Sequence, residues 1–332
     1  MPLAATRNGA ELVWGMARAY IFPGQGSQAV GMGKDLAAAY APARAVFDEV
    51  DEALHQKLSA LMFEGPEAEL TLTANAQPAL MAMSLAVVRV LEAEAGLDLV
   101  KDAAFVAGHS LGEYSALAAA GAFTISDAAR LLRRRGEAMQ QAVPLGQGAM
   151  AALLGLDYET GVAVAAQAQK EVGGDAVCAI ANDNGGGQVV VSGTKAAVEQ
   201  AIAIAKTKGA RRAILLPVSA PFHSALMQPA AEVMAEALAT VDIKPPRIPL
   251  VANVTAAPVK DPAEIRKLLV EQVTATVRWR ESMMFMAAQG VTLFVELGAG
   301  KVLTGLVKRI VDNANSIGVA VPAEVDAYKG LS

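Results

Sequence analysis

The fold is decided by the stretch AAFVAGHSLGEYSALAAA at residues 103–120. Its first five residues, 103–107, form an apolar run that is too short for a helix and predicts a buried strand. The run passes directly into Gly108-His-Ser-Leu-Gly112, and helical periodicity covers 111–120. A strand, a sharp turn and a helix in this order predict an α/β fold with a parallel sheet.

The turn matches the pattern G-x-S-x-G, in which a strained strand-to-helix turn exposes a serine hydroxyl above a sheet edge. Glycines at both flanks relieve the crowding of such a turn, so Ser110 is a candidate nucleophile. The amide N–H of Leu111, at the start of the helix, would then face a developing oxyanion. The alternative is that Ser110 only caps the helix.

A serine nucleophile needs a base, and the chain has three histidines. His55 lies in a charged helical stretch and is expected to be solvated. His109 adjoins the serine, and neighbours on a sharp turn point in different directions, which favours a structural role. His223, in the loop VSAPFHS at 218–224, is therefore the predicted base by elimination.

Three consecutive arginines at 133–135 lie on a predicted helix, whose periodicity separates them. Arg133 precedes Glu137 by four residues, which predicts a surface ion pair. Arg134 lies on a solvated face. Arg135 lies on the face of Leu132 and the other apolar residues, where a guanidinium needs an anionic partner. That partner is either an internal carboxylate or a substrate carboxylate held bidentately.

Residues 146–216 have a different pattern, in which strands and helices follow the order β-α-β-β-α-β of the ferredoxin-like motif. The sequence NDNGGG at 182–187 suits the hairpin turn of that motif. We therefore predict a small domain at 146–216 inserted into a large domain formed by 19–145 and 217–320. Residues 1–18 are predicted to be a disordered extension without the apolar region of a signal peptide, and 321–332 a surface tail. The elements expected in the large domain are strands at 19–22, 103–107 and 292–295 and helices at 34–62, 77–95, 111–120, 126–142, 225–239, 262–273, 280–289 and from 302.

The composition excludes several classes of protein. Of 332 residues, 54% are hydrophobic and 18% are charged, which argues against a disordered chain. The net charge of -5 argues against a whole-protein nucleic-acid footprint. The single cysteine, Cys178, cannot form an internal disulfide, so we expect a reducing compartment, the cytoplasm. The longest uncharged stretch, 70–88, is too polar for a membrane span, and no Cys/His cluster has zinc spacing. We accordingly predict no metal, no cofactor, no nucleic acid and no membrane.

Two glycine-rich loops allow other interpretations. The sequence GQGSQA at 24–29 matches the dinucleotide pattern G-x-G-x-x-[G/A], but Pro23 interrupts the junction and no acidic strand end follows. The sequence GAGK at 298–301 resembles a phosphate loop, with Val302 where serine or threonine belongs. A dinucleotide-binding module is therefore a weak alternative. A serine hydrolase is a better one, although its usual order is Ser…Asp…His and it would give Arg135 no role.

Five segments together resemble the malonyl-CoA:acyl-carrier-protein transacylases of bacterial type II fatty-acid synthesis. They are GQGSQ at 24–28, GHSLGEYSAL at 108–117, RRRGEAM at 133–139, the His223 loop and ELGAGKVL at 296–303, and the resemblance covers about 19–315. It implies an α/β-hydrolase-like core with an inserted ferredoxin-like subdomain. It also implies ping-pong transfer of a malonyl group to the phosphopantetheine thiol of acyl carrier protein, for fatty-acid chain elongation.

The resemblance also assigns roles to residues. Ser110 would be the nucleophile, His223 its base, and Gln25 and Leu111 the N–H donors of the oxyanion hole. Arg135 would hold the malonyl carboxylate. The resemblance implies that the main-chain carbonyl of Gln272 orients the histidine. It also implies that the bulky side chain of Phe222 restricts substituents on the α-carbon of the acyl group. The chain departs from the family in its N-terminal extension and in NGGGQ at 184–188, where a Pro-Gly turn is usual.

The carrier protein of this family is acidic, so its binding to a chain of net negative charge requires a local basic patch. The candidate cations fall in two groups, on the small domain and near the C-terminus: Lys206, Lys208, Arg211, Arg212, Lys301, Lys308 and Arg309.

Overall fold

The computed structural model describes residues 17–218 and 220–330. The predicted disordered extension falls almost entirely on residues 1–16, which lie outside the described residues. Strand β1 (Ala17–Phe22) begins two residues before the predicted start of the large domain at 19. Ala17 and Arg18 belong to it because both pair with neighbouring strands.

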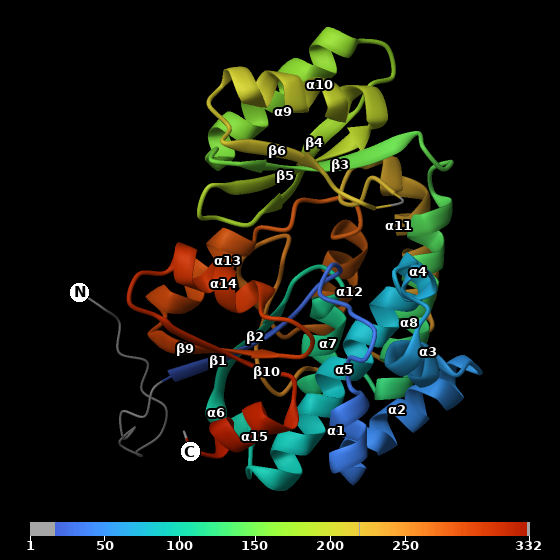
Figure 1. Cartoon of the computed structure of the whole chain (residues 1–332), viewed down its shortest axis with the longest axis vertical. Coiled ribbons are helices and arrows are strands. Elements are labelled where there is room, and N and C mark those ends of the chain that lie inside the picture. Colours follow the sequence, from blue (N-terminus) through green and yellow to red (C-terminus); the bar gives the residue numbers. More distant parts are fainter. Residues whose placement is uncertain (1–16, 219, 331–332) are drawn as a thin grey trace.

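The large domain is built on a six-stranded sheet of order β10-β9-β1-β2-β7-β8 (Figure 1). Its other strands are β2 (Ala103–Gly108), β7 (Leu250–Val251), β8 (Pro258–Val259), β9 (Val291–Leu297) and β10 (Asn315–Val319). All neighbours are parallel except β7 and β8. The predicted parallel sheet is confirmed. Because Phe22 pairs with Gly108, the loops that follow the two central strands emerge side by side.

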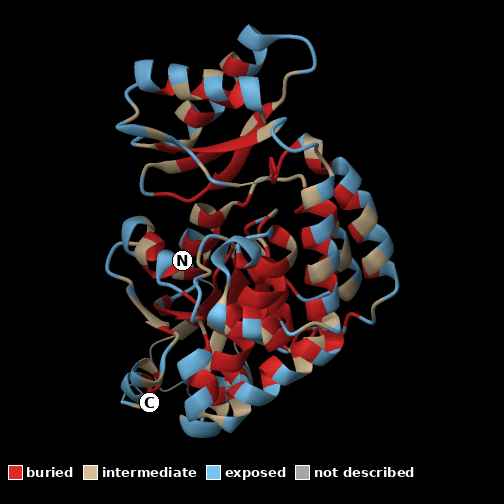
Figure 2. Cartoon of the chain, turned by 45° about the vertical axis from the view of Figure 1, so that its right-hand side comes forward, coloured by how far each residue is buried: buried red, intermediate tan, exposed pale blue. Residues whose placement is uncertain are grey.

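Helices cover both faces of this sheet, because alternate residues of its buried strands point to opposite sides. On one face, Tyr20 and Phe22 share a core with helices α5 (Thr73–Glu94), α7 (Gly112–Ala119) and α8 (Ile125–Gln141). On the other face, Ala19 and Ile21 pack with α13 (Trp279–Ala288) and α14 (Val302–Ile310). Figure 2 shows the buried residues gathered on the strands and on the helix faces turned toward them.

Helix α5 is the central helix of the large domain. Among the described residues it is the one helix long and apolar enough to cross a membrane, and 83% of its apolar window is buried inside the fold. The polar residues that argued against a span, such as Asn75 and Gln77, are buried with hydrogen-bond partners. The length and composition of α5 are therefore those of a core helix.

The predicted order β-α-β-β-α-β is also present. It consists of β3 (Gly148–Leu154), α9 (Tyr158–Val172), β4 (Cys178–Asp183), β5 (Gln188–Thr194), α10 (Lys195–Thr207) and β6 (Arg212–Leu215). These strands form an antiparallel sheet of order β4-β5-β3-β6.

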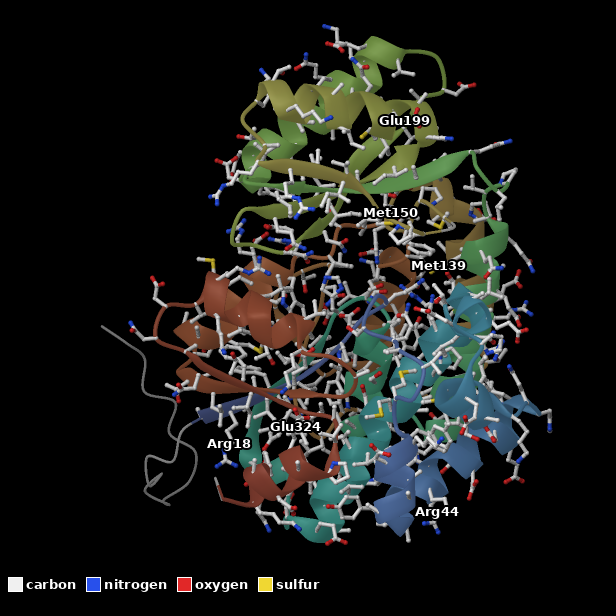
Figure 3. All side chains as sticks on the ribbon, viewed as in Figure 1. Arg18, Arg44, Met139, Met150, Glu199 and Glu324 are labelled. Atoms are coloured by element: carbon white, nitrogen blue, oxygen red, sulfur yellow. The ribbon has the colours of Figure 1, made fainter. Side chains whose placement is uncertain are left out.

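The two faces of the small sheet have different partners. Ala151 and Val191 pack with α9 and α10 in a core of their own. Met150 and Val190, one residue away, point to the opposite face and join the core of the large domain. Figure 3 labels Met150 on the small sheet and Met139 near the end of α8, and both residues belong to the large-domain core. The small sheet therefore lies over the large domain, and 146–216 remains our proposed boundary for the small domain.

The segment predicted as a surface tail at 321–332 is largely exposed or half-buried in its described part, but it is helical and two of its side chains are buried. Residues 322–329 form helix α15 (Pro322–Lys329), and Val325 and Tyr328 are 0% and 2% exposed. The Tyr328 hydroxyl lies 2.6 Å from that of Tyr20. These two apolar residues at a spacing of three are a short helical signal that polar neighbours obscured. Strand β10 was missed as well, because its five residues contain only two large apolar ones.

The predicted helix at 34–62 is divided into α1 (Lys34–Ala39), α2 (Ala41–Leu54) and α3 (Leu58–Glu64). His55 ends α2 in a left-handed conformation with φ of 49°. The remaining helices agree with expectation or are short: α4 (Glu67–Leu70), α6 (Leu99–Asp102), the 3-10 turn η1 (Ala225–Met227), α11 (Gln228–Ala239) and α12 (Pro262–Glu271).

Candidate active site

The turn between β2 and α7 holds Ser110 in a strained conformation. Its φ is 54°, a left-handed value that non-glycine residues rarely adopt. A Cβ on Gly108 would lie 1.9 Å from the main chain of Gly112, and a Cβ on Gly112 would lie 2.4 Å from the carbonyl oxygen of Phe22. Both flanking positions therefore require glycine, as the G-x-S-x-G pattern predicts.

Asn253, just after the neighbouring strand β7, holds this turn through two side-chain hydrogen bonds. Its Oδ1 accepts the amide N–H of Ser110 at 2.8 Å, and its Nδ2 donates to the carbonyl of Gly108 at 2.8 Å. One side chain thus satisfies main-chain groups on both sides of His109. Asn253 could not be predicted from the sequence, because a single asparagine after a two-residue strand carries no motif.

His223 lies against the serine although 113 positions separate the two in the chain. Its Nε2 is 2.8 Å from Ser110 Oγ. On the other side of the ring, Nδ1 is 2.8 Å from the carbonyl of Gln272 and 3.1 Å from that of Ala275. Because carbonyls only accept hydrogen bonds, Nδ1 carries the ring hydrogen and Nε2 presents its lone pair to the serine hydroxyl.

The electrostatic surroundings keep this histidine neutral. Burial, followed by the charge of Arg135, lowers the pKa of His223 to about 3, while the carbonyls of Gln272 and Ala275 oppose the shift. A neutral imidazole is the form that can take a proton from Ser110 at physiological pH. The arrangement is therefore a serine–histidine pair oriented by main-chain carbonyls rather than by an acid.

Arg135 lies beside the pair and is 1% exposed. Its Nη2 donates to Ser110 Oγ at 3.1 Å and to Gln272 Oε1 at 2.8 Å, and its Nη1 donates to Gln77 Oε1 at 2.9 Å. Helix α8 approaches α5 this closely because Gly136 has no side chain. A Cβ there would lie 2.6 Å from the Thr73 carbonyl oxygen.

The anionic partner that the sequence analysis expected for Arg135 is not a protein side chain. Within residues 17–218 and 220–330, Arg135 forms no ion pair with an aspartate or glutamate, and its buried Nε has no hydrogen-bond partner. The guanidinium retains its charge, since arginine is not deprotonated in proteins. Nε and Nη2 thus form a donor edge beside Ser110 Oγ that could receive a carboxylate.

Two main-chain donors lie near the serine. In the part of the chain that the structure describes, the N–H groups of Gln25 and Leu111 have no hydrogen-bond acceptor. The loop of Gln25 follows β1 and lies against the serine turn, since a Cβ on Gly24 would be 2.7 Å from the His109 carbonyl oxygen. The Gln25 side chain ties this loop to α5 through Thr73 Oγ1 at 3.2 Å.

Comparison with known proteins decides the family. An acyl transferase domain model matches residues 19–324. The malonyl CoA-acyl carrier protein transacylase of Bacillus subtilis strain 168 is 49% identical over 308 residues, covering 93% of this chain and 95% of that protein. The Escherichia coli K12 enzyme of the same name is 47% identical, with 93% and 97% covered. The chain belongs to the malonyl-CoA:acyl-carrier-protein transacylase family.

Solved structures agree with this membership of the transacylase family. An acyl-carrier-protein S-malonyltransferase from Bartonella henselae has 56% identity and a TM-score of 0.92, with 95% of this chain and 99% of that chain covered. A malonyl transacylase in complex with a type II polyketide acyl-carrier protein has 42% identity and a TM-score of 0.90, with 95% and 100% covered. The predicted fold class and the predicted enzyme class, an acyltransferase, are confirmed, and a serine hydrolase is not favoured.

The residues predicted from the sequence of this transacylase-family member mostly meet at one place. Ser110, His223, Arg135 and Leu111 lie together, and the Gln272 carbonyl faces the histidine. Phe222 precedes the histidine and is 7% exposed. Outside this site, the prediction of an ion pair between Arg133 and Glu137 is wrong, because the Arg133 guanidinium binds Gln56 and Asn75 instead.

The other two histidines are placed as expected. His55 is exposed at the end of α2. His109 packs beside Trp279, and its Nε2 lies 2.9 Å from Asn184 Oδ1 on the hairpin of the small domain. That hairpin contains the NGGGQ segment at 184–188, and its three glycines all have positive φ. Among the described residues, no group of His, Cys, Asp and Glu could hold a metal ion.

Proposed function

We propose that the protein transfers the malonyl group of malonyl-CoA to the phosphopantetheine thiol of acyl carrier protein through a malonyl-serine intermediate. The observation that carries this proposal is Arg135, a buried cation without an acidic partner whose donors point to Ser110 Oγ. A dicarboxylic acyl group attached to that oxygen would place a carboxylate in direct contact with the guanidinium, which no described aspartate or glutamate does. The names of the relatives give the same substrate and acceptor.

The first half-reaction forms the acyl-enzyme. His223 Nε2 takes the proton of Ser110 as Oγ attacks the thioester carbonyl. The N–H groups of Gln25 and Leu111 would bind the oxyanion, each contributing about 2.7–4 kcal/mol to the transition state. When the tetrahedral intermediate collapses, the carbon–sulfur bond breaks and the CoA thiolate takes the proton from His223.

The second half-reaction reverses the roles. His223 takes the proton of the phosphopantetheine thiol, and the sulfur attacks the malonyl-serine carbonyl. The bond to Ser110 Oγ then breaks, and the serine recovers its hydrogen from the histidine. Arg135 would keep the free malonyl carboxylate fixed throughout, so that the same carbonyl faces the oxyanion donors in both steps.

The carrier protein is proposed to bind through local cations. Lys206, Lys208, Arg211 and Arg212 are exposed at the end of α10 and on β6, and Lys308 and Arg309 are exposed on α14. Lys301 is already paired with Glu324 at 2.5 Å and is the weakest candidate. Replacing the lysines and arginines that bind the carrier protein by glutamate should raise the KM for the carrier protein. A residue whose replacement leaves this KM unchanged does not belong to the binding site.

We further propose that the reaction takes place in the cytoplasm, because a chain with a single cysteine forms no internal disulfide and suits a reducing compartment. The single cysteine, Cys178, is buried on β4, and burial raises the pKa of its thiol to about 12. Such a thiol remains protonated and unreactive.

Transfer and hydrolysis are separated by one assay. The protein is incubated with malonyl-CoA, with and without holo carrier protein, and malonyl-carrier protein and free malonate are both measured. We expect rapid malonyl transfer with holo carrier protein and little malonate in either reaction. Malonate as the main product in both reactions would support the hydrolase instead.

A further inference from the structure

Glu113 is a buried carboxyl group that the proposed reaction does not use. It lies in the first turn of α7, three residues after Ser110, and is 2% exposed. Within the described residues it forms no ion pair, and its two oxygens accept hydrogen bonds from two different segments. Oε1 accepts the main-chain N–H of Asn253 at 2.7 Å, and Oε2 accepts the side-chain amide of Gln272.

Both partners of Glu113 hold parts of the active site. Asn253 binds main-chain groups on either side of His109. Gln272 contacts four other groups. Its Nε2 donates to the Ser110 carbonyl at 2.9 Å and to Asn253 Oδ1 at 3.4 Å, its Oε1 accepts Arg135 Nη2 at 2.8 Å, and its main-chain carbonyl faces His223. Through Asn253 and Gln272, the carboxyl group of Glu113 is therefore linked by hydrogen bonds to the Ser110 turn, to His223 and to Arg135.

The contact between Glu113 and Gln272 determines which end of the Gln272 amide faces Arg135. An amide has one donor end and one acceptor end, whereas an ionised carboxylate and a main-chain carbonyl only accept. With Glu113 and the Ser110 carbonyl both facing Nε2, the amide can satisfy them in one orientation only. That orientation turns Oε1 toward the guanidinium of Arg135.

We propose that Glu113 is a positioning residue that sets the orientation of the Gln272 amide and thereby presents an acceptor to Arg135. The proposal rests on the proposed function, since it concerns the arginine that would hold the malonyl carboxylate. With Gln272 reversed, its NH₂ group would face the Nη2 donor, and Arg135 would keep Gln77 as its only fixed glutamine acceptor. The guanidinium would then be free to turn away from the acyl group on Ser110.

The ionised form of Glu113 is the form this role needs. Burial raises the pKa of Glu113 to about 8, while the hydrogen bonds from Asn253 and Gln272 and the charge of Arg135 oppose that shift. With that pKa the carboxylate is the main form only above about pH 8, so the assays below are run at about pH 9, where each of its oxygens can receive a donor.

The test is the Glu113→Gln variant, which keeps the shape and adds a donor. The measurement is kcat/KM for malonyl-CoA and for acetyl-CoA, each with holo carrier protein, in wild type and variant. Losing one hydrogen bond to a charged group corresponds to about a tenfold to hundredfold change. We expect the malonyl-to-acetyl ratio to fall by at least about tenfold, with acetyl transfer changed by less than about threefold.

Two controls separate positioning from general stability. Glu296→Gln alters another fully buried glutamate, one that accepts N–H groups of Leu303 and Thr304 at the start of α14. It should lower stability and leave the ratio unchanged. Gln272→Met removes the amide and should lower the ratio as Glu113→Gln does, even if the latter does not fold. The double variant should then show no further loss.

Several results would overturn the inference. They are equal losses for malonyl and acetyl transfer in Glu113→Gln, a normal ratio in Gln272→Met, or additive losses in the double variant. If the wild type prefers malonyl-CoA and the variants keep the same preference, only the role of Glu113 is contradicted. A wild type that transfers no malonyl group contradicts the proposed function itself.

Discussion

Replacing Arg135 by alanine tests the recognition of the malonyl carboxylate. In the structure the guanidinium is buried, and its fixed acceptors are Gln77 and Gln272, both uncharged. Its Nε has no partner among the described residues, and its Nη2 reaches Ser110 Oγ. The side chain is therefore fixed beside the acylated oxygen by uncharged acceptors, and no carboxylate of the described residues contacts it directly.

The expected loss follows from the two donors that a carboxylate would receive. Hydrogen bonds to charged groups contribute about 1.5–3 kcal/mol each, so two of them amount to about 3–6 kcal/mol. This corresponds to a fall of roughly 10²- to 10⁴-fold in kcat/KM for malonyl-CoA. Acetyl-CoA has no second carboxylate, so its transfer should change far less.

The assay is steady-state transfer to holo carrier protein with malonyl-CoA and acetyl-CoA in parallel. Arg134→Ala is the matched control, because Arg134 is the neighbouring residue on α8 and is exposed. It should leave both activities within about twofold of wild type. Arg135→Lys should recover only part of the malonyl activity, since a lysine cannot form the planar two-donor contact.

Equal losses of malonyl and acetyl transfer in Arg135→Ala would refute this reasoning. They would mean that Arg135 supports the structure of the site, or the charge on Ser110 Oγ, and does not select the acyl group. A large loss in Arg134→Ala would point to a general disturbance of helix α8.

Four further predictions concern the base, the turn and the selection of the acyl group. Because the pKa of His223 is lowered to about 3, the rate of CoA release should stay nearly constant from pH 7 to 5. An ordinary histidine would be about 97% protonated at pH 5, so a fall of about 25-fold over this range would contradict the prediction. The unfolded chain binds that proton near pH 6.5 and the folded chain does not, so urea melts should show stability decreasing as the pH falls from about 6.5 toward 3. Gly108→Ala should lower the free energy of unfolding in urea by about 1–3 kcal/mol, because its methyl group would lie 1.9 Å from the main chain of Gly112. The control is Gly305→Ala, whose methyl group would meet no atom within 4 Å. Equal stabilities of the two variants would show that the turn adjusts to the added methyl group. Phe222→Ala should raise transfer from methylmalonyl-CoA relative to malonyl-CoA in a competition assay, and an unchanged ratio would remove Phe222 from substrate selection.

The sequence predicts the parts of this fold that carry strong local signals. The apolar strand at 103–107, the glycine-bounded turn and the order of strands and helices in 146–216 each follow from spacing and composition. Strand β10 and helix α15 were missed, because each is short and is stabilised by contacts with distant elements, such as Tyr328 with Tyr20. Such contacts leave no periodic pattern in the chain.

The active site shows the same division. Ser110, His223 and Arg135 could be found because a motif, an elimination and a helix face each mark one residue. Asn253 and Gln77 could not, since each is a single amide whose importance depends on which distant group it meets. Glu113 was within the quoted motif, but only the fold shows that its carboxyl group meets Gln272, which is 159 positions later.

The central claim is a malonyl ester on Ser110, and intact-protein mass spectrometry tests it most directly. The protein is mixed with malonyl-CoA, its mass is recorded, and holo carrier protein is then added. We predict one malonyl adduct per chain, mapped to the peptide containing Ser110, absent from Ser110→Ala and discharged to the carrier protein. An adduct that persists in Ser110→Ala, or that maps to another residue, would contradict the account.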